Sequence, residues 1–90
     1  MPPISAEKRQ KIKEAIVALL YHNMPKPMFT AEIARELARD EEFVKQLLLE
    51  LQKQNIVRCI TKNEKGKTYV RRQRWQLTLK AYEAYSKLAV

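Results

Sequence analysis

Apolar residues in the first third of the chain recur at helical spacing. Ser5 suits the N-cap position, and the stripe that follows it consists of Ile12, Ala15, Ile16, Leu19 and Leu20. Pro25 and Pro27 remove backbone donors and push the residues before them toward extended conformations. The pattern therefore predicts a first helix that begins after Ser5 and ends near Asn23.

A second, shorter helical pattern follows the prolines. Thr30 is expected to cap this helix, and Glu32 in its first turn favours the positive end of the helix dipole. Ile33 and Leu37 fall on its inward face. The pattern predicts a helix of only about two turns.

The pattern restarts at Asp40 and predicts a third helix. Its inward residues recur at the spacing i, i+3, i+4 and i+7 and are Val44, Leu47, Leu48 and Leu51. The helix is expected to run to about Gln54, because Asn55 tolerates the left-handed conformation that ends many helices. A short turn therefore separates the second and third helices.

Residues that favour strands become frequent after position 55. A first strand is expected over 56–61, and a second begins at 68–70 and continues through Leu77. Between them, the polar segment 63–67 contains the single glycine of the chain, which indicates a hairpin turn. Thr78 then caps a last helix that contains Tyr82, Tyr85 and Leu88.

Two helices joined by a short turn and followed by a hairpin make a winged helix-turn-helix. The sequence predicts a single domain over 1–90 with an α+β, mostly α fold: three helices, a two-stranded wing and a C-terminal helix. Residues 44–51, 54–57 and 75–80 resemble winged-helix transcriptional regulators of the MarR and ArsR kind. Members of that group often have a leucine-rich recognition helix, a strand that begins with two aliphatic residues, and a Leu-Thr step into the final helix. The resemblance implies this fold and a role in transcription.

Charge adds a partner class to this picture. The chain has 90 residues, with 18 Lys+Arg against 10 Asp+Glu, so its formal charge is +8. Such an excess points to polyanionic partners. The net charge is +3 over 1–28, −2 over 29–55, +6 over 56–75 and +1 over 76–90. The predicted wing therefore holds most of the positive charge, whereas the helix-turn-helix is acidic.

Helical geometry turns one face of the third helix away from the core, and this face comprises Glu42, Gln46, Leu49 and Lys53. Gln46 can pair with adenine, Lys45 can reach guanine or phosphate, and Leu49 suits a thymine methyl or a protein partner. Glu42 either accepts from cytosine or only stabilises the helix N-terminus. The expected DNA-contacting residues are Thr30, Lys45, Gln46, Lys53, Lys62, Lys65, Lys67, Arg71, Arg72 and Arg74.

Association of two copies is also expected, because a chain this short has a small core. The last predicted helix carries more apolar surface than a single narrow stripe, and the first helix can join it in an interface. The expected dimer interface consists of Ile12, Leu19, Tyr82, Tyr85 and Leu88.

Catalytic and metal chemistry are not expected. His22 has no second histidine to share a metal, and Cys59 has no second cysteine for a disulfide or a thiolate site. Cys59 is either a small strand residue or a redox switch between chains. Ser5 and Ser86 lack a nearby base. The uncharged run 15–25 is too short to span a bilayer. These features predict a cytoplasmic protein that is not an enzyme and has no cofactor.

Together, these patterns predict a homodimer that binds double-stranded DNA and regulates transcription. The wing is expected to contact the backbone and minor groove, and the third helix the major groove. Trp75 is expected to pack beneath the wing root in preference to stacking on a base. Two alternatives remain open: a structured-RNA or ribosome-associated module, and a winged helix that docks a protein partner.

Overall fold

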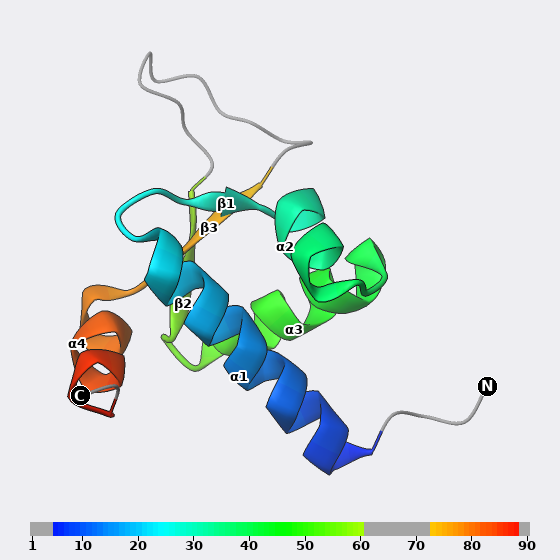
Figure 1. Cartoon of the computed structure of the whole chain (residues 1–90), viewed down its shortest axis with the longest axis horizontal. Coiled ribbons are helices and arrows are strands. Elements are labelled where there is room, and N and C mark those ends of the chain that lie inside the picture. The colour runs from blue at the N-terminus through cyan, green and yellow to red at the C-terminus, as the bar shows by residue number, and fades with distance from the viewer. Residues whose placement is uncertain (1–4, 61–72, 89–90) are drawn as a thin grey trace.

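The computed structural model of the chain describes residues 5–60 and 73–88. Its helices in these residues are α1 (Ala6–Asn23), α2 (Thr30–Leu37), α3 (Glu41–Lys53) and α4 (Leu79–Leu88). The strands β1 (Met28–Phe29), β2 (Val57–Ile60) and β3 (Arg74–Leu77) form an antiparallel sheet in the order β1-β3-β2. Figure 1 shows α1 crossing the body, with α2 and α3 on one side of it and α4 on the other. The predicted order of elements is confirmed, and β1 is an addition to it.

Most of the predicted helix ends are confirmed by capping interactions. The Ser5 hydroxyl accepts a hydrogen bond from the Lys8 backbone N–H at 3.2 Å at the start of α1. The Thr78 hydroxyl accepts one from the Ala81 N–H at 3.2 Å at the start of α4. Asn55 has a φ of 60° just after α3, which is the left-handed conformation expected of it. These residues satisfy backbone groups that a helix end leaves open.

The start of α2 differs from the prediction, because the N-cap is Phe29 and not Thr30. The Phe29 backbone N–H donates to Glu32 Oε1 at 3.0 Å, so the glutamate satisfies the helix end that the threonine was expected to satisfy. Phe29 is still extended because it pairs with Arg74 in the sheet, and the helix begins directly after this pair. A strand of two residues between prolines and a helix has too short a pattern to be recognised in sequence.

Trp75 lies at the centre of the hydrophobic core and is fully buried. Its indole N–H donates to the Thr30 hydroxyl at 2.7 Å, so its polar atom is satisfied inside the core. The side chains packed into the same core come from α1, α2, α3 and β2 and include Ile16, Leu20, Ile33, Val44, Leu48 and Val57. The prediction that Trp75 packs beneath the wing root is therefore confirmed.

The sheet has an inner and an outer face. Val57 and Leu77 are opposite each other in the register and are both buried on the inner face, where α1 and α3 pack. Side chains alternate along a strand, so the next pair in the register, Arg58 and Gln76, lies on the outer face. The antiparallel pairing of β2 with β3 confirms the root of the predicted hairpin. Its predicted turn at 63–67 and the strand segment 68–70 lie outside the described residues.

An ion cluster joins α1 to α3 on the surface of the core. Lys13 Nζ lies 3.0 Å from Glu50 Oε1, and the Arg9 guanidinium contacts the other carboxylate oxygen. Arg9 also lies over the ring of Phe43, with 5.9 Å from its guanidinium carbon to the ring centroid. The hydrogen bond from Lys13, followed by the nearby positive charges, lowers the pKa of Glu50 despite an opposing effect of burial.

We expect this cluster to make stability depend on pH. The folded pKa of Glu50 is below its unfolded value, so the stabilisation is present above the unfolded pKa and is lost as the pH falls through the folded one. Glu50→Gln should lower the free energy of unfolding near neutral pH by up to about 1 kcal/mol, because the carboxylate is partly exposed. Urea denaturation at a series of pH values measures this difference, which should shrink below pH 4.5.

Glu7→Gln is the matched control, because the Glu7 carboxylate is largely exposed and lies 3.9 Å from Lys11 in a helical i,i+4 pair. Its effect on stability should be smaller at every pH. A Glu50→Gln difference that stays constant from neutral to acidic pH would contradict this role of the cluster.

Candidate nucleic-acid interface

The exposed face of α3 is the first part of the candidate interface. The side chains that the helical pattern turns outward are all exposed in the structure: Glu42, Gln46, Leu49 and Lys53. Lys45, on the flank of this face, is half-buried. Leu49 has 40% of its surface exposed, whereas the three other leucines of α3 and Val44 are buried in the core. The helix therefore exposes polar groups and one apolar side chain on this face, as its sequence predicts.

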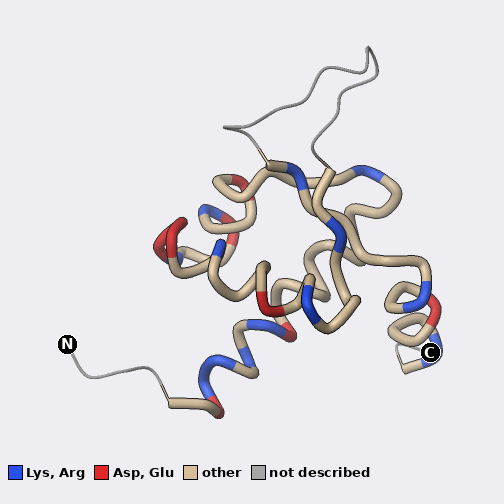
Figure 2. The backbone as a smooth tube through the Cα atoms, turned by 180° about the vertical axis from the view of Figure 1, so that it is seen from behind, with Lys and Arg blue, Asp and Glu red and all other residues tan. Residues whose placement is uncertain are grey.

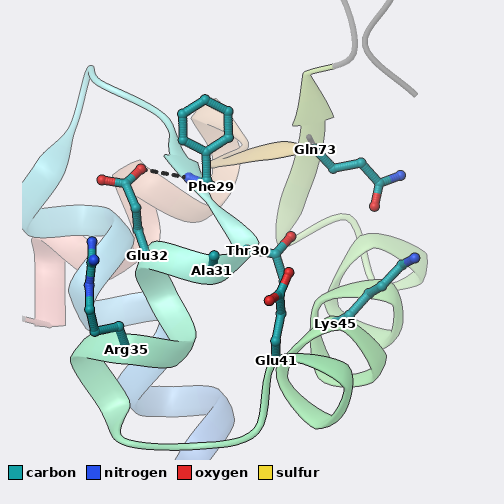
Figure 3. A pocket seen from close by; sticks show the side chains of 8 residues that line it. All are labelled: Phe29, Thr30, Ala31, Glu32, Arg35, Glu41, Lys45 and Gln73. Carbon is teal, nitrogen blue, oxygen red and sulfur yellow. Dashed lines mark hydrogen bonds between the residues drawn. The ribbon is translucent and has the colours of Figure 1, made fainter. Parts of the chain in front are cut away.

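A hollow of about 520 Å³ lies beside this face, between the first turns of α2 and α3 and the end of the sheet (Figure 3). Its lining residues are Phe29, Thr30, Ala31, Glu32, Arg35, Glu41, Lys45 and Gln73. Figure 3 shows Lys45 and Gln73 on one side of the hollow, and Arg35 with Glu32 on the other. The Gln73 carbonyl accepts from the Thr30 backbone N–H at 3.3 Å, which connects the hollow to the start of β3. The hollow thus lies between α3 and the start of β3, at the root of the predicted wing.

Thr30 lies in the hollow but is only 7% exposed. Its hydroxyl oxygen accepts the Trp75 indole N–H, so the hydroxyl proton is the atom left to donate to a ligand. The predicted DNA contact of Thr30 would use this proton and stays a prediction. The structure shows that Thr30 also couples the hollow to the core.

Charges in the hollow are mixed. Glu32 is occupied by the Phe29 N–H, whereas Glu41 is exposed in the first turn of α3, where a carboxylate stabilises the helix N-terminus. Arg35 and Lys45 supply the positive charge. Glu50, which the helical pattern places next to the outward face of α3, is turned to α1 and paired there with Arg9 and Lys13. This pairing removes one unbalanced negative charge from the neighbourhood of the interface.

Of the predicted wing residues, only Arg74 lies in the part of the chain that the structure describes. Lys62, Lys65, Lys67, Arg71 and Arg72 lie outside the described residues. Arg74 is half-buried in β3, opposite Ile60 of β2 and Phe29 of β1. It is on the strand face opposite to Trp75, as the alternation predicts. Phosphate contact by these residues stays a prediction.

The predicted dimer residues differ in how far they are exposed. Ile12 is 8% exposed and packs in the core of its own chain, because it follows the same inward stripe of α1 as Ile16 and Leu20. This burial counts against an interface contact by Ile12, which stays a prediction. Leu19, Tyr82 and Tyr85 are half-buried, while Leu88 is 84% exposed.

A cluster of aromatic rings attaches α4 to the end of α1. The ring of Tyr21 stacks on that of Tyr82 with 5.1 Å between centroids, and it lies 4.7 Å from that of Tyr85. The Ser86 hydroxyl donates to the Tyr21 hydroxyl at 3.2 Å. These contacts explain why the two tyrosines of α4 are not fully exposed. They leave the leucines at its ends, Leu79 and Leu88, uncovered.

The residues weighed for catalysis, redox chemistry or metal binding have ordinary surroundings. His22 is exposed at the end of α1, with its ring edge-on to Tyr21 at 5.7 Å. Cys59 is half-buried in β2, and burial raises the pKa of its thiol, which disfavours the reactive thiolate. Residues 5–60 and 73–88 contain no group of three or more His, Cys, Asp or Glu side chains placed to hold a metal ion. Within the same ranges, every helix is too short or too polar to cross a membrane.

Arg35 and Gln73 are members of the hollow that the sequence pattern does not identify. Arg35 is an ordinary exposed charge on the outer side of a short helix, and Gln73 precedes a strand in a region dominated by arginines. Only the close approach of α2, α3 and β3 brings them together. A basic residue two positions after the inward Ile33 is a weak signal that repeats along many surface helices.

Comparison with solved structures places this arrangement among known folds. ZitR of Lactococcus lactis, in an apo form with two substitutions, matches with a TM-score of 0.72 and 27% identity over 93% of this chain and 58% of that chain. MepR of S. aureus in complex with DNA matches with a TM-score of 0.69 and 19% identity over 93% of this chain and 72% of that chain. The chain has a winged helix-turn-helix fold.

The winged-helix chain spans only about half the length of the first MepR and ZitR chains that it matches, 53% and 58%. A smaller neighbour is the Zα domain of PKZ from Carassius auratus in complex with Z-DNA. It matches with a TM-score of 0.62 and 25% identity over 79% of this chain and 98% of that chain. No protein-family model and no curated protein matches the sequence.

The bond between Trp75 and Thr30 generates a testable prediction. Thr30→Val keeps the shape of the side chain but leaves the buried indole N–H without its acceptor. We expect the free energy of unfolding to fall by about 1–3 kcal/mol, the cost of an unsatisfied buried donor. Thermal and urea unfolding measure it. Thr30→Ser keeps the hydroxyl and is the control, which should retain more stability than Thr30→Val. A larger loss in Thr30→Ser than in Thr30→Val would show that the methyl group contributes more than the hydrogen bond, and would contradict this prediction.

Proposed function

We propose that this winged-helix protein binds double-stranded DNA and regulates transcription. In this proposal α3 enters the major groove and the predicted wing contacts the backbone or the minor groove. The observation that carries it is the exposed polar face of α3 beside a hollow that leads to the wing root. The fold shared with MepR, a protein solved in complex with DNA, supports the same conclusion.

In this proposal a few side chains of α3 contact the edges of the bases. Gln46 is exposed at the middle of the outward face, and its amide can donate to and accept from adenine. Lys45 points along the hollow and can reach guanine or a phosphate, and Lys53 extends the positive charge at the far end of the helix. Glu41 and Glu42 stand near the entering end of the helix and weaken contact with phosphates there. Affinity must therefore come mainly from outside α3.

The positively charged segment 56–75 is the source of affinity in this proposal. It carries a net charge of +6, and arginine grips phosphate through its planar donor fork. Each phosphate neutralised releases counterions, so about six contacts would give a slope near −5 for log K against log salt concentration. A nearly flat salt dependence would contradict backbone binding by this segment.

We expect substitutions in α3 and in the wing to have different effects. Gln46→Ala should mainly relax sequence preference, because it removes base contacts worth about 1–3 kcal/mol of discrimination. The pair Arg72→Ala and Arg74→Ala should weaken binding to every duplex and reduce the salt slope. Selection from a random duplex pool, followed by titration of the selected and a scrambled duplex at several salt concentrations, measures both. Equal losses on the two duplexes from both variants would refute this division of roles.

The same titrations separate the other candidates. Matched RNA and DNA duplexes in competition test a structured-RNA partner, since a basic wing alone does not discriminate between them. An alternating C-G duplex held in the left-handed form tests the partner recorded for the Zα domain. Leu49, with its 40% exposure, favours a protein partner as the second candidate. In that case the wing alone contacts nucleic acid, so Leu49→Asp should abolish binding of the protein partner and leave DNA binding intact.

Two copies of the chain form a dimer in this proposal, through α4. Its end residues Leu79 and Leu88 are 71% and 84% exposed, and none of its side chains is fully buried within the chain. Burying two leucines against a second copy would remove apolar surface from water. A two-fold dimer would also present two α3 helices to half-sites on one duplex.

Leu88→Asp tests the dimer without disturbing the core, because this side chain makes few contacts in its own chain. The wild-type protein should sediment as a dimer at micromolar concentration, and the variant as a monomer with an unchanged circular dichroism spectrum. Lys87→Asp, which also adds an acidic residue to the exposed end of α4, is the matched control and should leave the dimer largely intact. A monomeric wild-type protein would remove the dimer from the proposal.

A further inference from the structure

The outer face of the sheet is a second basic surface, distinct from the outward face of α3. The elements that form it are β2, β3 and the loop 24–27 between α1 and β1, and they contain Lys26, Arg58 and Arg74 but no Asp or Glu. Figure 2, seen from behind, shows blue segments and no red ones on the two strands and this loop. The acidic residues of the described chain lie on the helices and their connections instead.

Arg58 on this face is held by a neutral side chain. Its Nε and Nη2 donate to the amide oxygen of Gln76 at 3.2 and 2.8 Å. Gln76 is 8% exposed, and its own amide nitrogen donates to the carbonyl of Pro25. The chain of contacts therefore runs from a loop carbonyl through a buried amide to an exposed guanidinium.

This arrangement orients Arg58 without cancelling its charge. A carboxylate in the place of Gln76 would fix the guanidinium equally well but would neutralise it. Within residues 5–60 and 73–88, no carboxylate lies within ion-pair distance of Arg58. The donors that Gln76 does not use remain on the two terminal nitrogens and can take a phosphate in the bidentate manner typical of arginine.

Two further cations accompany Arg58. Arg74 is two positions before Gln76 on β3 and so is a diagonal neighbour of Arg58 on the same face. Lys26 directly follows Pro25, the residue that anchors Gln76. Lys26 and Arg58 therefore belong to separate segments that meet around one buried glutamine. Arg74, a wing contact in the proposed function, lies where this face meets the start of β3.

We propose that this outer face, with Arg58 as its central contact and Gln76 as the residue that positions it, binds the phosphate backbone of a second duplex segment. The proposal rests on DNA binding by α3 and the wing. Positive charge without nearby acidic groups complements a polyanion. The sheet and α1 separate this face from the outward face of α3, so a straight duplex lying on α3 does not also cover it. One chain would then hold two duplex segments.

The test measures bridging of two duplexes by energy transfer between a donor-labelled and an acceptor-labelled random-sequence duplex. The protein carries Leu88→Asp throughout, so that a dimer cannot provide the bridge. We expect energy transfer with otherwise wild-type protein. Arg58→Ala should raise the protein concentration needed for bridging about tenfold, as for a lost charged hydrogen bond. Affinity for a single duplex, measured with one label by anisotropy, should change less than about twofold, because Arg58 makes no hydrogen bond to the duplex held by α3 and the wing.

Two further variants separate position from charge. Lys11→Ala removes one exposed positive charge from α1 and should leave bridging unchanged. Gln76→Glu keeps the shape of the side chain but pairs Arg58 with a carboxylate, and it should impair bridging as much as Arg58→Ala. Circular dichroism and thermal unfolding identify any loss of fold. A folded Gln76→Glu protein that bridges normally would remove Gln76 from the proposal.

Other outcomes overturn the second site. Bridging that is indifferent to Arg58→Ala would refute it while leaving the proposed function intact. An equal loss of single-duplex affinity and of bridging would mean that Arg58 contacts the first duplex, which also refutes it. If neither the wild-type protein nor the Gln46→Ala and Arg72→Ala variants bind any duplex, the proposed function and the second site are removed together.

Discussion

The arrangement of this protein depends on the burial of Trp75 and on the hydrogen bond from its indole to Thr30. This residue is on β3, in the middle of the sheet, and its partner is the first residue of α2. The bond therefore ties the strand that leads out of the predicted wing to the helix that precedes α3. Because the pair is buried, any shift of α2 relative to the sheet would leave the indole N–H or the Thr30 hydroxyl without its partner, which costs free energy. The hollow beside α3 exists where these elements meet.

Charge in the described chain is handled in two different ways. At the contact of α1 with α3, Glu50 offsets one of the two positive charges of Arg9 and Lys13, so the cluster contributes to folding and ties its cations to a carboxylate. On the outer sheet face, Arg58 is matched only by the amide of Gln76, which provides geometry and leaves the charge in place. In the first arrangement a carboxylate already occupies donors of the cations and repels a phosphate at close range, whereas in the second no carboxylate does so. Pairing thus decides which cations are available for binding, and a count of basic residues does not.

Sequence patterns predicted the elements well where a stripe was long. The stripe of α3, Val44 to Leu51, correctly identified both its buried and its exposed faces, and Thr78 and Asn55 correctly marked helix ends. Prediction failed where an element was short or a residue had two roles. The two residues of β1 have no period to detect, and Thr30, a good cap by residue type, is turned inward by its contact with Trp75. Ile12 appeared free for an interface because nothing local reveals how wide a stripe the core requires.

The order of apolar and polar residues was enough to determine the helices, the hairpin root and the positive charge concentrated after α3, since these depend on local spacing and composition. The pairings that give individual residues their roles came only from the folded chain: Glu50 with α1, Gln76 with Arg58 and Pro25, and Trp75 with Thr30. The physical reason is that each pairing joins residues far apart in sequence. Its existence depends on how helices and strands pack, which periodicity along one segment does not specify.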